Sequence, residues 1–237
     1  GLGDLPGGRF SSQALGVSAD GGVVAGRSLS ALAAEAFRWT AATGLQGLGT
    51  LGAEGFESRA MAVSADGSVI VGWSHTPRGQ EAFRWTVATQ MESLGDLPGG
   101  PVFARATAVS PDGSVVVGQG SSQAGFEAFR WTWATGMLPL GDLPGGPVDG
   151  QALGVSADGS VIVGRSATAA GYQAFVWTAA DGMQSLRDVL ARSHGLADAV
   201  RDWVLSQATG ISADGRTIVG FGINPRGEME AWLADLS

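Results

Sequence analysis

The chain has 237 residues, of which 44% are hydrophobic and 15% charged, a composition that supports a packed core and excludes a disordered protein. Its formal net charge of -8, with no lysine at all, argues against nucleic acid or an anionic membrane surface as the partner. The absence of cysteine excludes disulfides and thiolate chemistry. Charged residues such as Arg27 and Asp158 interrupt the apolar runs, so we expect no membrane span.

An Asp-Gly pair recurs along the chain. The pairs start at Asp20, Asp66, Asp112, Asp158 and Asp214, so their spacings are 46, 46, 46 and 56 residues. A fixed period of this length is typical of propellers and solenoids. The repeat therefore predicts one domain over residues 1–237, built from five similar units.

Each unit contains four strand patterns. In the second unit, the apolar runs 60–64 and 68–72 flank the pair Asp66-Gly67, which predicts a hairpin. Residues 81–86 are rich in aromatic side chains and end in threonine, as suits a third strand, and residues 91–94 form a short fourth one. The sequence thus predicts an all-β protein, a five-bladed β-propeller of four-stranded antiparallel blades.

The two ends of the sequence complement each other. Residues 1–8 match the end of a unit, 93–100, whereas the fifth unit stops after its third strand pattern. Because a ring removes exposed strand edges, we expect the N-terminal strand to close it. The expected boundaries are about 10–51, 56–97, 102–143 and 148–189 for blades one to four, about 187–203 for a helical insertion, and about 204–237 completed by 1–5 for blade five.

The insertion explains the longer last spacing. Its apolar residues recur at helical intervals and predict one or two short amphipathic helices; they are Val189, Leu190, Leu196, Val200 and Trp203. We expect these helices to dock on blades four and five, on the face that carries the variable loops, with His194 near the rim of the ring mouth. Aromatic pairs two residues apart, such as Phe83 and Trp85, are expected to pack between blades.

Several long motifs resemble the HAF repeat family of bacterial extracellular repeats. They are Leu-Gly-Asp-Leu-Pro-Gly-Gly, Val-Ser-Ala-Asp-Gly-Ser, Val-Val-Gly and Glu-Ala-Phe-Arg-Trp-Thr, and they cover essentially the whole chain, although residues 48–54 depart from the first motif. The blade pattern is similar, more coarsely, to WD40 propellers. The resemblance implies export from a bacterial cell, hence an extracellular or cell-surface location, and it brings no catalytic residues.

Residues present in every unit are interpreted as scaffold. The aspartate of each Asp-Gly pair is expected to cap its turn rather than bind Ca²⁺ or act as an acid. The recurring glutamate and arginine of the third strand, such as Glu81 and Arg84, are expected to form ion pairs. We expect no metal and no cofactor, because the sequence contains neither a His-x-x-x-His spacing nor a phosphate-binding loop.

Residues that differ between units lie mainly in the connection from second to third strand and in the one leading to the next blade. Both connections are expected to open on one side of the ring. The candidate ligand-binding residues there are Trp73, His75, Arg78, Phe126, Tyr172, Asn224 and Arg226, with Arg27, Arg165 and Phe221 beside them. Aromatic and arginine side chains suit stacking on sugar rings and bonding to hydroxyl or carboxylate groups. Ordinary exposed loops are the competing interpretation.

The sequence favours a secreted, non-enzymatic binding or structural module, a monomer whose partner is a glycan or other cell-surface material. The alternative is an extracellular polysaccharide hydrolase or lyase, with His75 or a loop carboxylate at the central mouth. A histidine within hydrogen-bond reach of a hydroxyl or carboxylate at the mouth would favour the enzyme.

Overall fold

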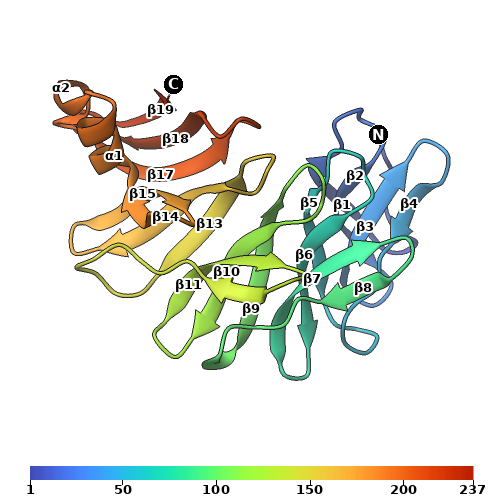
Figure 1. Cartoon of the computed structure of the whole chain (residues 1–237). Helices are drawn as coiled ribbons and strands as arrows, with labels where there is room; N and C mark the ends of the chain where they lie inside the picture. The colour runs from blue at the N-terminus through green and yellow to red at the C-terminus, as the bar shows by residue number, and fades with distance from the viewer. Residues whose placement is uncertain (237) are drawn as a thin grey trace.

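The computed structural model describes residues 1–236 and shows antiparallel strands in consecutive repeat units, with two short helices (Figure 1). Unit 1 contains β1 (Gly7–Val17), β2 (Val24–Ser30), β3 (Ala34–Thr40) and β4 (Gly44–Gly47). Unit 2 contains β5 (Ser58–Val63), β6 (Ile70–Thr76), β7 (Gly79–Thr86) and β8 (Gln90–Ser93). Unit 3 contains β9 (Gly99–Val109), β10 (Val116–Ser122), β11 (Phe126–Thr132) and β12 (Gly136–Pro139).

Unit 4 contains β13 (Gly150–Val155), β14 (Val161–Thr168), β15 (Gly171–Thr178) and β16 (Gly182–Ser185). Helices α1 (Leu186–Ser193) and α2 (Ala197–Val200) follow, and unit 5 contains β17 (Val204–Ile211), β18 (Thr217–Ile223) and β19 (Met229–Asp235). Strands pair in chain order within each unit, and one parallel bridge, Gln80 to Phe103, joins units 2 and 3. The all-β prediction is confirmed. Within residues 1–236, no helix is long and apolar enough to cross a membrane.

The Asp-Gly turns are built by short polar networks. In unit 2, the Ser64 hydroxyl donates to Asp66 Oδ1 (2.6 Å), which also accepts the Ser68 amide (2.9 Å), while Ser64 Oγ accepts the Val69 amide (3.0 Å). Gly67 has φ +72°, and a Cβ there would lie 2.4 Å from Val23 Cγ2 of unit 1. The aspartate therefore caps the turn, as predicted, and the glycine also allows neighbouring turns to pack closely.

Adjacent units pack an aliphatic face against an aromatic face. In unit 2 the aliphatic face consists of Val69, Val71, Ala82 and Leu94, and it contacts the aromatic face of unit 3, which includes Ala106, Val116, Phe129 and Trp131. The same positions meet between units 1 and 2 and between units 3 and 4. The aromatic pairs therefore pack between units, as predicted.

The expected closure of the ring is not what the structure shows. Within residues 1–236, β19 pairs with β18 alone and unit 5 has three strands. Residues 1–5 lie against their own unit 1 instead: the Leu5 amide donates to Ser28 Oγ (2.9 Å) and the Ser12 hydroxyl donates to the Gly3 carbonyl (2.7 Å). Equivalent bonds hold Leu51 and Leu143 on units 2 and 4. This segment is thus fixed by the unit that follows it in the chain, which leaves the sheets at the two ends open.

The helical insertion docks against units 4 and 5, as predicted, but His194 lies beside the edge strand β19 and not at the rim of a ring mouth. Leu186 and Leu190 of α1 and Val200 of α2 are buried in a core shared with Val163 and Ala174 of unit 4 and with residues of unit 5. Trp203 packs against the same core and is half-buried. The insertion therefore extends the aliphatic face of unit 4, where units 2 and 3 use the Leu-Gly-Asp-Leu motif.

The expected glutamate–arginine ion pairs of the third strands do not form within residues 1–236. Glu81 pairs with Arg78 (2.9 Å) and accepts the Ser93 hydroxyl (2.6 Å), while Arg84 lies over the Trp133 ring, 5.6 Å from its centroid. The reason is the alternation of a strand, which directs Glu81 and Arg84, three positions apart, to opposite faces.

Candidate functional site

A contiguous set of polar and aromatic side chains lies at the junction of units 3 and 4. We call it the arginine–aromatic cluster; its members are Phe103, Arg105, Gln119, Phe126, Asp149, Arg165 and Tyr172. Strands β9, β10, β11, β14 and β15 supply six of them, and Asp149 lies directly before β13. An isolated bridge between Phe126 and Asp149 brings the two units together at this point.

Gln119 connects the two units through its side-chain amide. Its Oε1 accepts a hydrogen bond from Arg105 Nη2 (2.7 Å), and its Nε2 donates to Asp149 Oδ1 (3.1 Å) and to the Gly150 carbonyl (3.0 Å). Gln119 is buried, so these bonds fix both the guanidinium and the carboxylate.

Tyr172 holds the other oxygen of the same carboxylate. Its hydroxyl donates to Asp149 Oδ2, and the Arg165 guanidinium lies over its ring with Cζ 4.4 Å from the centroid. The bond to Asp149, which is the larger cause, and burial together raise the pKa of the Tyr172 hydroxyl above its usual value, while the positive charge of Arg165 opposes this.

Aromatic surface borders the guanidinium of Arg105. Phe103 and Phe126 form an edge-to-face pair with centroids 5.2 Å apart, and Arg105 Cζ lies 5.7 Å from the Phe103 centroid. Phe126 is 44% exposed, which leaves an apolar ring beside charged donors at the surface.

The electrostatics of the cluster favour an anion. Burial, and then the like charge of Arg165, lower the pKa of the Arg105 guanidinium, while Asp149 raises it. Within residues 1–236, no carboxylate lies within 4.0 Å of a guanidinium nitrogen of either Arg105 or Arg165. The cluster thus contains two arginines and one aspartate, and the aspartate's oxygens accept hydrogen bonds from Gln119 and Tyr172 and not from either arginine. A ligand carboxylate would supply the missing counter-charge.

The predicted pair Trp73 and His75 lies in unit 2. The two rings are 5.2 Å apart and tilted by 59°. No hydroxyl or carboxylate of the described chain lies within hydrogen-bond reach of the His75 or His194 imidazole, and residues 1–236 contain no group of three or more potential metal-ligating side chains. The acid–base geometry that would favour an enzyme is not assembled around either histidine.

Three other predicted residues mainly hold their own turns. Arg78 pairs with the buried Glu81, and Arg226 pairs with Glu228 (3.4 Å). Asn224 is buried; its Oδ1 accepts the amides of Arg226 (2.9 Å) and Glu228 (3.0 Å), and its Nδ2 donates to Glu230 Oε2 (2.8 Å). Asn224 therefore closes the β18–β19 turn and is not available to a ligand.

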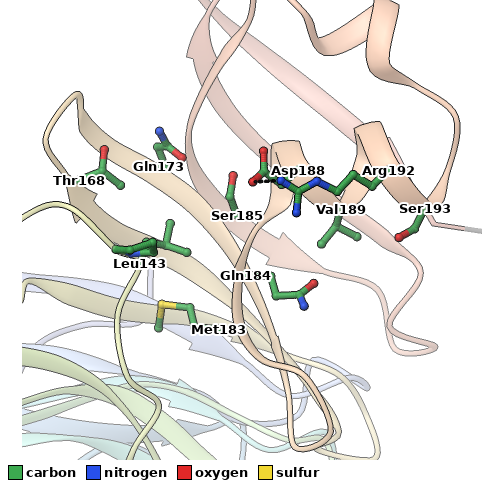
Figure 2. A pocket seen from close by; sticks show the side chains of 11 residues that line it. Leu143, Thr168, Gln173, Met183, Gln184, Ser185, Asp188, Val189, Arg192 and Ser193 are labelled. Atoms are coloured by element: carbon green, nitrogen blue, oxygen red, sulfur yellow. Dashed lines mark hydrogen bonds and ion pairs between the residues drawn. The ribbon is translucent and has the colours of Figure 1, made fainter.

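Two hollows flank the insertion. A cleft of about 450 Å³ lies beside α1, and Figure 2 shows Asp188 and Arg192, paired at 3.4 Å, on one side of it, with Thr168 and Gln173 on the other. Both charged residues are exposed and neutralise each other, so this cleft offers a weaker anion site than the cluster. The second hollow, of about 600 Å³, contains His194 and runs along β19, which places this histidine at the open edge of unit 5.

The sequence identified Phe126, Arg165 and Tyr172 but not their partners. Phe103, Arg105 and Gln119 lie within strands, whereas the candidates were drawn from the two variable connections. A usable signal exists in the register: Arg105 pairs with Gln119, and the equivalent cross-strand pairs are Gln13 with Arg27, Arg59 with Trp73, and Gln151 with Arg165. Positions that differ between units thus extend into the strands.

No family model matches the sequence, and no curated protein matches it. Solved structures do. TolB from Acinetobacter baumannii is similar with a TM-score of 0.59 and 14% identity, over 95% of this chain and 54% of that one. A putative TolB from Agrobacterium tumefaciens gives 0.61 and 13%, over 95% and 77%, and a prolyl endopeptidase gives 0.58 and 10%, over 96% and 35%.

The chain therefore spans about half the length of the Acinetobacter TolB. The HAF-repeat resemblance stays a prediction, because no comparison tests it. Identities this low carry no information on activity. The likeness shows that this chain has an all-β fold similar to the β-propellers of TolB.

Proposed function

We propose that the chain is an exported, non-enzymatic binding module that recognises an acidic sugar unit of a glycan through the arginine–aromatic cluster. The proposal keeps the five units as propeller blades and the HAF-type extracellular location expected from the sequence. It narrows the expected binding surface from the whole variable face to the junction of units 3 and 4.

One observation carries the proposal: Arg165 and Arg105 lie in one network and neither has a carboxylate partner within residues 1–236. A guanidinium binds a carboxylate through two parallel hydrogen bonds, and a uronic acid presents such a carboxylate on a ring that can stack on Phe126 or Tyr172. Because the chain as a whole carries a charge of -8, a polyanion would gain little from non-specific attraction. Recognition would depend on these local donors.

The test is a glycan array that contains matched neutral and uronic-acid oligosaccharides, followed by calorimetry on each hit. We expect acidic hits, with affinity reduced at least about tenfold, or about 1.4 kcal/mol, by Arg165→Gln. Arg192→Gln, which removes an exposed arginine of α1, is the matched control and should bind like the parent. Arrays on which only neutral sugars bind, or an Arg165→Gln variant with unchanged affinity, would contradict the proposal. Release of shortened or unsaturated products from a bound glycan would instead support the hydrolase or lyase alternative.

A further inference from the structure

The aliphatic face of unit 5 has no unit packed against it. Val219 and Ala231 occupy the positions of Val71 and Ala82, which are both 0% exposed in unit 2. Val219 is 41% exposed, Leu233 on the same side of β19 is 66% exposed, and Ala231 is also exposed. This end of the chain therefore presents the side of a unit that every earlier unit buries.

The aromatic face of unit 1 is open in the same way. Ala14 is exposed, whereas the equivalent Ala60, Ala106, Ala152 and Ala208 are all fully buried in junctions between units. Trp39 is half-buried like the equivalent Trp177, whereas Trp85 and Trp131 are buried, so the alanine position shows the difference most clearly. The two open faces are thus the two halves of one repeated interface.

Leu2 is the exposed member of a set that is otherwise buried. It is 37% exposed, while the equivalent leucines, which follow the fourth strand of each unit, are between 0% and 8% exposed; they are Leu48, Leu94, Leu140 and Leu186. The amides of Leu48, Leu94 and Leu140 donate to the carbonyls of Ala36, Ala82 and Ala128, each on the third strand of the same unit. The corresponding acceptor for Leu2 is the Ala231 carbonyl of β19.

The Asp-Gly turns show a matching unpaired position. The Ala19 amide donates to the Ala65 carbonyl, and the Ala157 amide to the Ala213 carbonyl, both at 2.9 Å. Each bond joins the turn of one unit to that of the next. Following the same pattern, the Ala213 amide of unit 5 would donate to an Ala19 carbonyl.

A groove of about 600 Å³ lies where the fourth strand of unit 5 would pair. It runs along residues 230–235 of β19 and is bordered by Leu190, Val200 and Trp203 of the insertion. In unit 4 the equivalent edge of β15 is hydrogen-bonded to β16. An edge of this kind, beside an apolar wall, accepts an extended segment.

We propose that a second copy of this chain docks head-to-tail on unit 5, with its unit 1 continuing the series of units and its Leu2 segment lying against β19. This interface would continue the one already formed between units, because the side chains, the backbone donor and the backbone acceptor at the two ends repeat those of the internal junctions. Such an interface is heterologous, so it builds open chains or larger rings. It differs from the monomer expected from the sequence, which stays a prediction.

The chain's own N-terminus is the other possible occupant. In this structure it is held on unit 1 by the Leu5–Ser28 and Ser12–Gly3 bonds, and the end units lie at opposite ends of the curved array (Figure 1). The experiment therefore has to separate association between copies from closure within one copy.

The test uses sedimentation velocity of the whole chain over a wide concentration range, with two variants that each disable one end. Leu233→Asp places a charge on the open aliphatic face of unit 5, which we call the tail. Leu2→Asp places a charge on the N-terminal segment of unit 1, which we call the head. Both positions are exposed, so the fold should persist. Val87→Asp, at an exposed position between β7 and β8, is the matched control.

We expect the average mass of the parent and of Val87→Asp to increase with protein concentration, from one chain to two and then to larger assemblies. Each end variant alone should stay at the mass of one chain. Their equimolar mixture should form pairs and nothing larger, because one variant keeps an intact head and the other an intact tail. A parent that stays monomeric throughout, end variants that associate like the parent, or a mixture that does not pair would overturn the proposal.

A cross-link distinguishes closure from docking. The chain has no native cysteine, so Leu2→Cys combined with Ala231→Cys gives one thiol on each of the two surfaces that the proposal brings together. Oxidation should produce a ladder of covalent multimers on a denaturing gel. A cross-linked product that migrates as a single chain would show that the N-terminus closes its own ring, and the proposal would be wrong.

Discussion

The guanidinium of Arg165 lies over the Tyr172 ring, 4.4 Å from Cζ to the centroid, while the hydroxyl of the same tyrosine donates to Asp149. A cation on the ring face and a carboxylate at the ring edge thus hold one aromatic side chain within unit 4. This contact orients the Arg165 guanidinium without neutralising it, because the ring is uncharged.

The ionisation of Tyr172 reports this contact directly. Tyr172 is the only tyrosine in the chain, so the ultraviolet absorbance of tyrosinate follows this residue alone. Asp149 accepts a hydrogen bond from the Tyr172 hydroxyl and carries a negative charge, so the pKa of that hydroxyl is raised. We therefore expect its titration midpoint above the ordinary value of about 10.

Asp149→Asn should move that midpoint toward lower pH, since the charge that disfavours tyrosinate is removed. Tyr172→Phe is the spectroscopic control and should abolish the signal. A midpoint that is unchanged in Asp149→Asn would show that the hydroxyl does not bond to Asp149 in solution.

The turn aspartates make stability dependent on pH in acid. Hydrogen bonds from the Ser64 hydroxyl, and then from Ser68, lower the pKa of Asp66 from 3.8 to about 2, and the equivalent carboxyls of the other four turns are lowered too. A carboxyl with a lower pKa in the folded state stabilises the protein above its unfolded pKa. This contribution is lost as the pH falls from about 4 to about 2.

We therefore expect the melting temperature to decrease over that acid range, and to decrease less steeply in Asp66→Asn, which keeps the oxygen acceptor but does not ionise. Thermal melts followed by circular dichroism at several pH values are the measurement. An equal pH slope in the parent and the variant would exclude Asp66 as a contributor.

The fold was predictable because its determinants are local and repeated. The Asp66-Gly67 hairpin, the Phe83 and Trp85 alternation and the helical spacing of Leu190 and Val200 each reflect a short-range rule that the structure obeys. Closure was predicted wrongly because it is a property of the whole ring. Whether residues 1–5 reach β19 depends on small angles between successive units, and the sequence carries no local signal for their sum.

The candidate site was predictable only in part. Phe126 and Tyr172 stand out because they lie at the starts of β11 and β15, next to connections that differ between units, and both are in the cluster. Arg105 and Gln119 lie inside strands, and the sequence does not reveal that they face each other until the cross-strand register is known. Asn224 was a wrong candidate because the sequence does not distinguish a buried asparagine that caps its own turn from an exposed one that could bind a ligand.

Gly67→Ala tests the packing of neighbouring turns. An alanine there would need φ near +72° and would place Cβ 2.4 Å from Val23 Cγ2, so backbone strain and overpacking add. We expect a loss of about 2–4 kcal/mol in the free energy of unfolding, measured by urea denaturation. Gly44→Ala shares the positive φ but meets nothing within 4 Å, and it should lose only about 1–2 kcal/mol. Equal losses in the two variants would mean that contact between turns contributes nothing.

Leu190→Ala tests whether the insertion is part of the core. Leu190 is 2% exposed and packs with α2 and with unit 5, so its truncation leaves a cavity between the helices and the sheet. We expect a loss of about 2–5 kcal/mol in the free energy of unfolding, together with faster amide hydrogen exchange over residues 186–200. Arg192→Ala, on the exposed side of the same helix, should change stability by about 0.5 kcal/mol or less. If Leu190→Ala were as stable as Arg192→Ala, the helices would contribute nothing to the core. The insertion would then not form a stable side of the groove beside β19, where we place a second chain.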